Sequence, residues 1–144
     1  MNLTPVNDDL YYTKENVSLA EYEMHQKVFN LNIVHAPRVI SYNATTKQMV
    51  MERVCVMNVS DWYGDDANVI HEELFDRIRA IIQILYDHNI LYRDITGYNF
   101  LEESSDKLWI IDFEHATYHP TGIPRDDFVN AFLDGMNKWN PEFA

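Results

Sequence analysis

The chain has 144 residues, of which 47% are hydrophobic and 13% aromatic. This composition can bury one core, but the length is too short for two independent domains. With 11 basic and 23 acidic residues the formal charge is −12, which repels phosphate backbones and anionic lipid surfaces. We therefore expect one compact unit over residues 1–144 that binds neither nucleic acid nor membrane.

The sequence favours an intracellular, cytoplasmic location. The first ten residues, MNLTPVNDDL, carry acidic groups where a signal peptide carries Lys or Arg. No window approaches the roughly 18 to 20 apolar residues that span a bilayer. Cys55 is the single cysteine and cannot form an internal disulfide, which fits a reducing compartment. Its place in an apolar run predicts a buried thiol.

The first third of the chain predicts strands around one helix. Residues 9–15 (DLYYTKE) have the composition of a short strand that carries Lys14. Ser18 and Glu21 have the spacing of a capping box that opens a helix through about Leu31. Residues 38–43 and 47–54 flank a tight connection, so we expect an antiparallel pair of strands there.

The remainder predicts a mostly helical unit with one hairpin. From about Asn68 to His88 apolar residues recur at helical spacing, which predicts the central core helix. Residues 99–103 and 107–112 are β-type runs on either side of a Ser-Ser-Asp turn. A final helix is expected from about Asp126 to Lys138, and its inward side chains are predicted to be Phe128, Phe132, Leu133 and Met136.

Three polar residues stand in an order that suits phosphoryl transfer. Asn99 follows Asp94 by five residues, and Asp112 follows the predicted hairpin. A loop can direct Asp94 at an acceptor hydroxyl, while Asn99 and Asp112 offer hard oxygen ligands to Mg²⁺ bridging the phosphates of ATP. Each residue taken singly is also a common turn former or strand cap. Their order in the sequence, directly after a long amphipathic helix, favours the interpretation as a phosphoryl-transfer site.

Two of these segments resemble protein kinases. YRDITGYN, residues 92–99, resembles the kinase catalytic loop, and IIDFE, residues 110–114, resembles the Asp-Phe-Gly metal motif. QMVMERV, residues 48–54, resembles the strand that enters the kinase hinge. That resemblance implies that Met51 is the gatekeeper. An ordinary buried strand is the alternative interpretation of residues 48–54.

The resemblance assigns further roles around the nucleotide. It places Glu52 and Val54 where hinge backbone groups meet adenine. Lys14 resembles the phosphate-binding lysine of the third kinase strand, although a solvated edge lysine is equally consistent with its position. Glu21 resembles the helix glutamate that pairs with this lysine; a capping-box role for Glu21, or Glu23 as the partner, are the alternatives.

A helix aspartate that holds the kinase catalytic loop from below also has candidates. The resemblance implies that Asp126 or Asp127 has this role. An N-cap of the final helix explains either residue as well.

The sequence departs from typical protein kinases at several positions. Its first glycine is Gly64, so the glycine-rich loop that covers ATP phosphates is absent. Tyr92 replaces the usual loop histidine, and Thr96 stands where Ser/Thr kinases carry lysine. The Asp-Ile-Thr loop resembles small atypical kinases associated with tRNA modification. Glu114 replaces the glycine of the metal motif, and Asp-Phe-Glu resembles choline and aminoglycoside phosphotransferases.

The fold implied by the resemblance is α+β, a minimal protein-kinase-like fold. We expect a reduced β-rich N-lobe over about residues 1–54 and a truncated helical C-lobe over about residues 55–144. Too few residues follow Asp112 for a long activation segment and a peptide-docking platform. A second copy could cover the front strand edge, because unpaired edges are seldom left bare, so a homodimer is a further expectation.

The function implied is an ATP- and Mg²⁺-dependent phosphotransferase that transfers the γ-phosphoryl group to a hydroxyl acceptor, which we expect to be on a protein. Asp94 is the expected catalytic residue. Mg²⁺ and ATP are the expected cofactors, with Asn99 and Asp112 as metal ligands, and the residues expected to bind the nucleotide are Lys14, Glu21, Glu52, Val54, Asn99 and Asp112. The alternative is a kinase mimic, or pseudokinase, that binds and regulates a partner protein without turnover.

Overall fold

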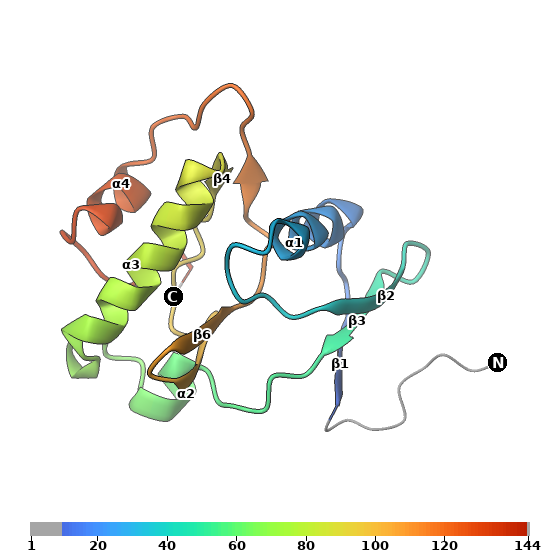
Figure 1. The fold of residues 1–144 in the computed structure, drawn as a ribbon, viewed down its shortest axis with the longest axis horizontal. Helices are drawn as coiled ribbons and strands as arrows, with labels where there is room; N and C mark the ends of the chain where they lie inside the picture. Colours follow the sequence, from blue (N-terminus) through green and yellow to red (C-terminus); the bar gives the residue numbers. More distant parts are fainter. Residues whose placement is uncertain (1–9, 144) are drawn as a thin grey trace.

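The structure is a computed structural model that describes residues 10–143. Residues 1–9, which carry most of the acidic N-terminal stretch and the start of the expected N-lobe, lie outside the described residues. The elements follow in the order β1 (Tyr11–Lys14), α1 (Leu19–Leu31), β2 (Val39–Asn43), β3 (Gln48–Glu52), α2 (Val59–Tyr63), the 3₁₀ turn η1 (Ala67–Val69), α3 (Glu72–Asp87), β4 (Ile90–Leu91), β5 (Phe100–Ser104), β6 (Lys107–Ile110), β7 (Thr117–Tyr118) and α4 (Asp127–Leu133) (Figure 1).

A three-stranded antiparallel sheet of order β1-β3-β2 lies beside α1 at one side of the molecule (Figure 1). Its register places Tyr12 opposite Met51 and Lys14 opposite Met49. Val17, Met49 and Met51 form a small core there. The predicted strand around Lys14 and the predicted strand pair after it are confirmed, because alternating side chains pack on this core.

Helix α1 begins where the sequence predicts. Ser18 Oγ accepts the Glu21 backbone N–H at 3.1 Å and caps the helix. The buried side chains of α1 are Glu21, His25 and Val28, which share one face at helical spacing. Val28 belongs to the main core, but the other two are titratable. This face of α1 therefore serves a polar site as well as the core.

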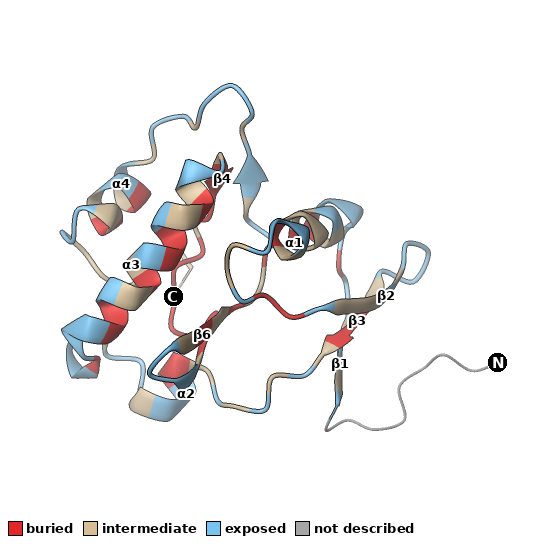
Figure 2. Cartoon of the chain, in the orientation of Figure 1, coloured by how far each residue is buried: buried red, intermediate tan, exposed pale blue. Residues whose placement is uncertain are grey.

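Helix α3 supplies the centre of the main core. Its buried side chains recur at helical spacing and form a stripe along one side of the helix (Figure 2); they are Leu74, Phe75, Ile78, Ile81, Ile82 and Leu85. The predicted start near Asn68 is wrong, since the helix begins at Glu72. Residues 67–69 form the separate turn η1, and Ile70 after it is extended and buried. Ile70 therefore contributes to the core from outside the helix.

Helix α4 is shorter than predicted. It ends at Leu133, because a turn with Gly135 at φ 76° follows instead of the expected helical residues to Lys138. Phe132 is fully buried, as predicted. Met136 was expected inward and this expectation is wrong, since the side chain is 77% exposed.

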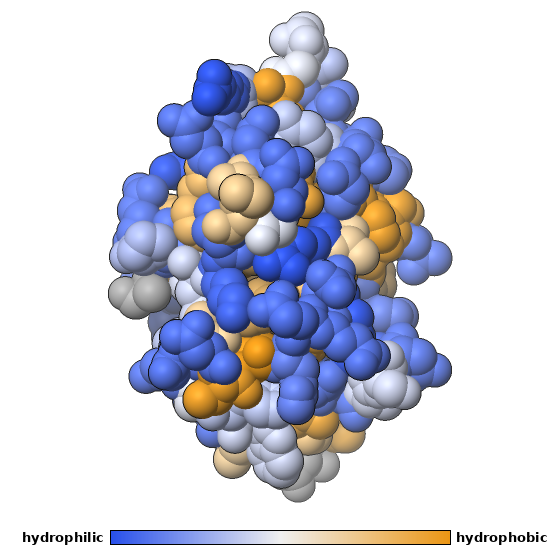
Figure 3. All heavy atoms as spheres, turned by 90° about the vertical axis from the view of Figure 1, so that its left-hand side faces the viewer, coloured by the Kyte–Doolittle hydropathy of each residue, from blue (hydrophilic) through white to orange (hydrophobic). Residues whose placement is uncertain are grey.

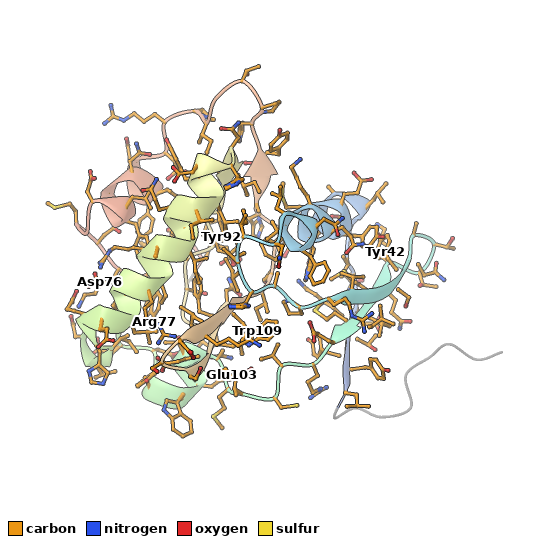
Figure 4. All side chains as sticks on the ribbon, in the orientation of Figure 1. Tyr42, Asp76, Arg77, Tyr92, Glu103 and Trp109 are labelled. Carbon is orange, nitrogen blue, oxygen red and sulfur yellow. The ribbon has the colours of Figure 1, made fainter. Side chains whose placement is uncertain are left out.

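Hairpin β5–β6 is held against α3. Arg77, labelled in Figure 4, donates to the Glu102 carboxylate and to the Ser104 carbonyl, the latter at 2.7 Å. Phe100 pairs with Ile110, so the hairpin has the predicted antiparallel form. Arg77 therefore attaches strand β5, near the hairpin turn, to helix α3.

The surface corrects one further expectation. Cys55 is exposed, because β3 ends at Glu52 and the apolar run after it forms the connection to α2. On the side where α3 and α4 lie, the surface is mainly hydrophilic, with hydrophobic side chains in small separate groups (Figure 3). Within residues 10–143, none of the helices has the length and apolar character needed to cross a bilayer.

A matched pair of variants tests the boundary of α4. Phe132→Ala removes a fully buried ring and is expected to lower the free energy of unfolding by about 3 to 5 kcal/mol. Met136→Ala removes an exposed side chain and should change it by less than about 0.5 kcal/mol. Chemical denaturation measures both values. Equal losses in the two variants would mean that α4 continues past Leu133.

Candidate functional site

The hairpin brings two of the predicted site residues to one place. Asn99 comes directly before β5, and Asp112 follows the end of β6 by two residues. Because the strands pair, their flanking residues are neighbours, and the Ile111 N–H donates to the Asn99 carbonyl at 2.9 Å. Asp112 has a φ of 63°, in the left-handed region, and turns the chain out of the hairpin.

Lys14 links this end of the hairpin to the front sheet and to α1. Its Nζ lies 2.6 Å from Glu21 Oε2 and 3.3 Å from Asp112 Oδ1. The Glu21 side chain is only 3% exposed and pairs with Lys14, so a capping-box role alone does not account for it. Strand β1, helix α1 and the segment after β6, which lies far along the chain, thus place one cation between two carboxylates.

The environment perturbs both partners of the buried pair. Burial raises the pKa of the Glu21 carboxyl, and the Lys14 ammonium opposes this rise only in part. Burial alone would lower the pKa of Lys14, but the bond to Glu21 and the charge of Asp112 outweigh it, and the pKa is raised. Lys14 therefore keeps its positive charge at neutral pH.

Asp94 lies in a tight loop and is 8% exposed. Its carbonyl accepts the Thr96 N–H at 3.0 Å and the Asn99 Nδ2 at 2.8 Å. Burial raises the pKa of the Asp94 carboxyl, and the charge of Asp112 adds to the rise, while Asn99 and His115 act against it. The loop thus holds a basic carboxylate near Asp112.

The loop has close neighbours on several sides. A Cβ on Gly97 would lie 2.1 Å from Ser60 Oγ and 3.0 Å from Ser60 N, so a glycine allows α2 to pack against the loop. Tyr92, labelled in Figure 4, is only 1% exposed, and its hydroxyl donates to the Ile111 carbonyl at 2.7 Å. This tyrosine joins the loop to the segment that carries Asp112.

The charge of Arg93 is directed at the start of α4. Arg93 Nε donates to Asp126 Oδ2 at 3.0 Å, and Asp126 Oδ1 also accepts the Val129 N–H at 2.9 Å. Asp126 thus combines the two alternatives that the sequence left open, a helix cap and a partner of the loop. Asp127 is exposed and pairs with Arg125 instead.

A cleft of about 340 Å³ joins these groups. It is bounded by the front sheet, α1 and the open end of hairpin β5–β6. All six residues predicted to bind the nucleotide line it: Lys14, Glu21, Glu52, Val54, Asn99 and Asp112. The backbone N–H and the carboxylate of Glu52 bind the backbone of Arg38, at 2.9 and 2.7 Å. Asp94 is not among the lining residues and adjoins the cleft through Asn99.

Several lining residues had no role in the sequence interpretation, among them His25 and Tyr12. His25 lies one turn after Glu21, with Nε2 2.7 Å from the Pro37 carbonyl, and burial lowers its pKa. Tyr12 lies two residues before Lys14 on the same face of β1. Helical spacing from Glu21 and strand alternation from Lys14 are the signals that could have identified both.

The donor set suits Mg²⁺ that arrives with phosphates. Asn99 uses its amide nitrogen on the Asp94 carbonyl, which leaves the side-chain oxygen as an acceptor beside the Asp112 carboxylate. Among residues 10–143 no three His, Cys, Asp or Glu side chains form a metal-binding group. Mg²⁺ commonly takes one or two carboxylates and completes its shell with water and substrate phosphates. The residues present fit that mode of binding.

The chain matches no protein-family model and no curated protein sequence. Among solved structures, the kinase PK-1 of Cydia pomonella granulovirus has a similar fold, with a TM-score of 0.57 and 15% sequence identity. The similarity covers 81% of this chain and 46% of that kinase chain, so this chain spans less than half of its neighbour's length. At this identity the similarity shows the fold. The expectation of a mixed α and β, kinase-like fold is confirmed at that level.

The raised pKa of Asp94 predicts that its ionised carboxylate destabilises the fold at neutral pH. In buffer without divalent cations, Asp94→Asn should unfold less readily than the wild type at pH 7. A carboxyl whose pKa is raised by folding stabilises the fold below its ordinary pKa, and this contribution disappears as pH rises through the raised value. Asparagine does not ionise, so its advantage should shrink as pH falls towards the ordinary carboxyl range. Urea unfolding across pH 4 to 8 measures the difference.

Asp106 is the matched control for this experiment. It is exposed in the hairpin turn, and the Ser104 hydroxyl lowers its pKa. Asp106→Asn should therefore show no gain that grows with pH. The same gain in both variants would contradict the account of Asp94.

Proposed function

We propose that this protein is an ATP- and Mg²⁺-dependent phosphotransferase that transfers the γ-phosphoryl group to a hydroxyl, most simply on a protein. One observation carries the proposal: Lys14 Nζ lies within 3.3 Å of both Glu21 and Asp112 in the same cleft that Asn99 lines. A cation, a metal-type carboxylate and an amide oxygen from separate segments meet there. This is the donor set that phosphates and Mg²⁺ require.

The cleft also has room and chemistry for a nucleotide base. Its volume, about 340 Å³, is within the range of small-molecule sites. Tyr12, Met49 and Met51 offer an apolar wall, and Glu52 and Val54 line the edge where backbone groups can meet adenine. In this proposal residues 10–54 serve as a small front lobe and residues 55–143 as the back lobe, with the phosphates directed to Lys14.

The transfer step uses groups of the chain itself. Asp94 accepts the proton of the acceptor hydroxyl as that oxygen forms its bond to the γ-phosphorus. The bond from the γ-phosphorus to the bridging oxygen breaks, and its electron pair leaves with ADP. Lys14 orients the phosphates, and Asn99 and Asp112 would hold Mg²⁺, which supplies charge neutralisation. The raised pKa of Asp94 makes its carboxylate a better proton acceptor.

A kinase mimic that binds a partner protein is the second candidate. Residues 1–63 contain no glycine, so they supply no glycine-rich loop of the kind that covers the ATP phosphates in kinases. A mimic would bind its partner through the shape of the fold. Its complex would then form equally well with Asp94→Ala and Asp112→Ala variants in a co-purification experiment.

Calorimetric titration with ATP and MgCl₂ tests the phosphotransferase proposal. We expect metal-dependent binding in the wild type, its loss in Asp112→Ala, and its retention in Asp94→Ala together with loss of phosphoryl transfer. Asp106→Ala is the control, because Asp106 is an exposed aspartate of the same hairpin, remote from the open end. No binding at millimolar ATP would refute the proposal and leave the mimic.

Tyr12 is expected to cover the adenine base. Its ring lines the cleft and is 46% exposed, with the Arg53 guanidinium 5.6 Å from the ring centroid. Base–aromatic stacking contributes about 1 to 3 kcal/mol, so Tyr12→Ala should weaken ATP binding by about 5- to 150-fold. Tyr11→Ala is the control, since alternation directs Tyr11 to the opposite face of β1. Equal losses in both variants would contradict stacking by Tyr12.

A further inference from the structure

The segment after α4, residues 137–143, returns to the loop that carries Asp94. Asn140 in this segment is 3% exposed. Its Nδ2 donates to the Arg93 carbonyl at 2.8 Å, and its backbone N–H donates to the Ile95 carbonyl at 2.8 Å. One residue thus holds the backbone immediately before and immediately after Asp94.

With these bonds, the three consecutive carbonyls of Arg93, Asp94 and Ile95 each accept a hydrogen bond. The middle one, of Asp94, accepts from Thr96 and Asn99 within the loop. The two outer ones, of Arg93 and Ile95, accept from Asn140. Because the direction of a side chain follows from the peptide groups on either side, Asn140 acts on the orientation of the Asp94 carboxylate without contacting it.

The amide of Asn140 is itself fixed in orientation. Its Oδ1 accepts the Glu142 N–H at 3.1 Å, so both ends of the side-chain amide have partners. A rotated amide would direct Oδ1 at the Arg93 carbonyl, and two acceptors would face each other. The side-chain amide of Asn140 therefore suits its surroundings, which offer one acceptor, the Arg93 carbonyl, and one donor, the Glu142 N–H.

A second connection between the same segments is weaker. Arg93 Nη2 donates to Glu142 Oε2 at 2.8 Å, but the Glu142 side chain is 59% exposed. Exposed ion pairs contribute little to a fixed geometry because water and salt screen them. The buried Asn140 is the stronger restraint on the loop.

We propose that Asn140 is a positioning residue for phosphoryl transfer, which fixes Asp94 in the direction needed to accept the proton of the acceptor hydroxyl. The proposal rests on the proposed function. It assigns a role to the segment NKWNPEF, residues 137–143, in which the sequence shows no recognised motif.

Steady-state kinetics of two matched variants test the proposal. Asn140→Ala is expected to lower kcat by about 10- to 100-fold, since small misplacements of a catalytic group cost that much, with KM for ATP unchanged. Asn137→Ala removes an amide from the same segment that binds the Phe128 carbonyl of α4 at 3.2 Å, and should leave kcat unchanged. The residual kcat of Asp94→Ala, measured at high enzyme concentration, should not fall further when Asn140→Ala is added, because the two residues act as a unit.

Amide hydrogen exchange gives a reading that does not depend on activity. The Ile95 and Thr96 amides donate to carbonyls within the loop, and they should exchange faster in Asn140→Ala than in Asn137→Ala. If Asn140→Ala does not fold, Asn140→Asp replaces it, because aspartate keeps the volume and the backbone bond to Ile95 and loses the amide donor.

The outcomes separate the two proposals. An active wild type with unchanged kcat in the Asn140 variants, or a further loss in the Asp94→Ala background, overturns the positioning role. A wild type that transfers no phosphoryl group refutes the proposed function. Exchange of the Ile95 and Thr96 amides then decides whether Asn140 holds the loop, and unchanged exchange overturns that role too.

Discussion

The Lys14 ammonium is the point on which the arrangement of the site depends. Glu21 is almost completely buried, and a buried carboxylate without a partner is strongly destabilising. Lys14 extends from β1 to Glu21 and also binds Asp112, which lies at the open end of hairpin β5–β6. The front sheet, α1 and the segment after β6 are therefore held in one relative arrangement, and the cleft between them follows from it.

The loop around Asp94 shows how the rest of the molecule supports a costly group. Burial and the neighbouring charge of Asp112 both disfavour the ionised Asp94 carboxyl. The backbone around Asp94 is nevertheless held by hydrogen bonds from outside the loop. The Ser60 N–H binds the Gly97 carbonyl, and Asn140 binds the carbonyls on either side of Asp94. A fold that accepts such a group without gaining stability from it has the character of a functional site.

The main core and the site are linked through shared elements. Val28 of helix α1 packs in the main core, and Glu21 of the same helix lines the cleft. Hairpin β5–β6 is attached to α3 through Arg77 and carries Asn99 and Asp112 at its open end. The packing of the core therefore constrains the positions of the polar groups, because the same elements carry both.

Local patterns in the sequence determined much of the fold and of the site. Strand alternation, the Ser18 cap and the periodicity of α3 depend on neighbours in the chain, and the structure follows them. The order of Asp94, Asn99 and Asp112 also pointed to one place, because a hairpin must bring its own ends together. The similarity to a solved kinase structure agrees with the fold that these patterns imply.

Only the tertiary structure decided the features that depend on contacts between distant segments. It ended α4 at Leu133 and left Met136 exposed, because a turn with Gly135 at φ 76° follows the helix. It selected Glu21 over Glu23 as the partner of Lys14, and it brought Asn140 to the loop of Asp94. Neither contact has a signature in local spacing. The sequence specifies the residues and the short-range structure, and long-range packing decides which of those residues meet.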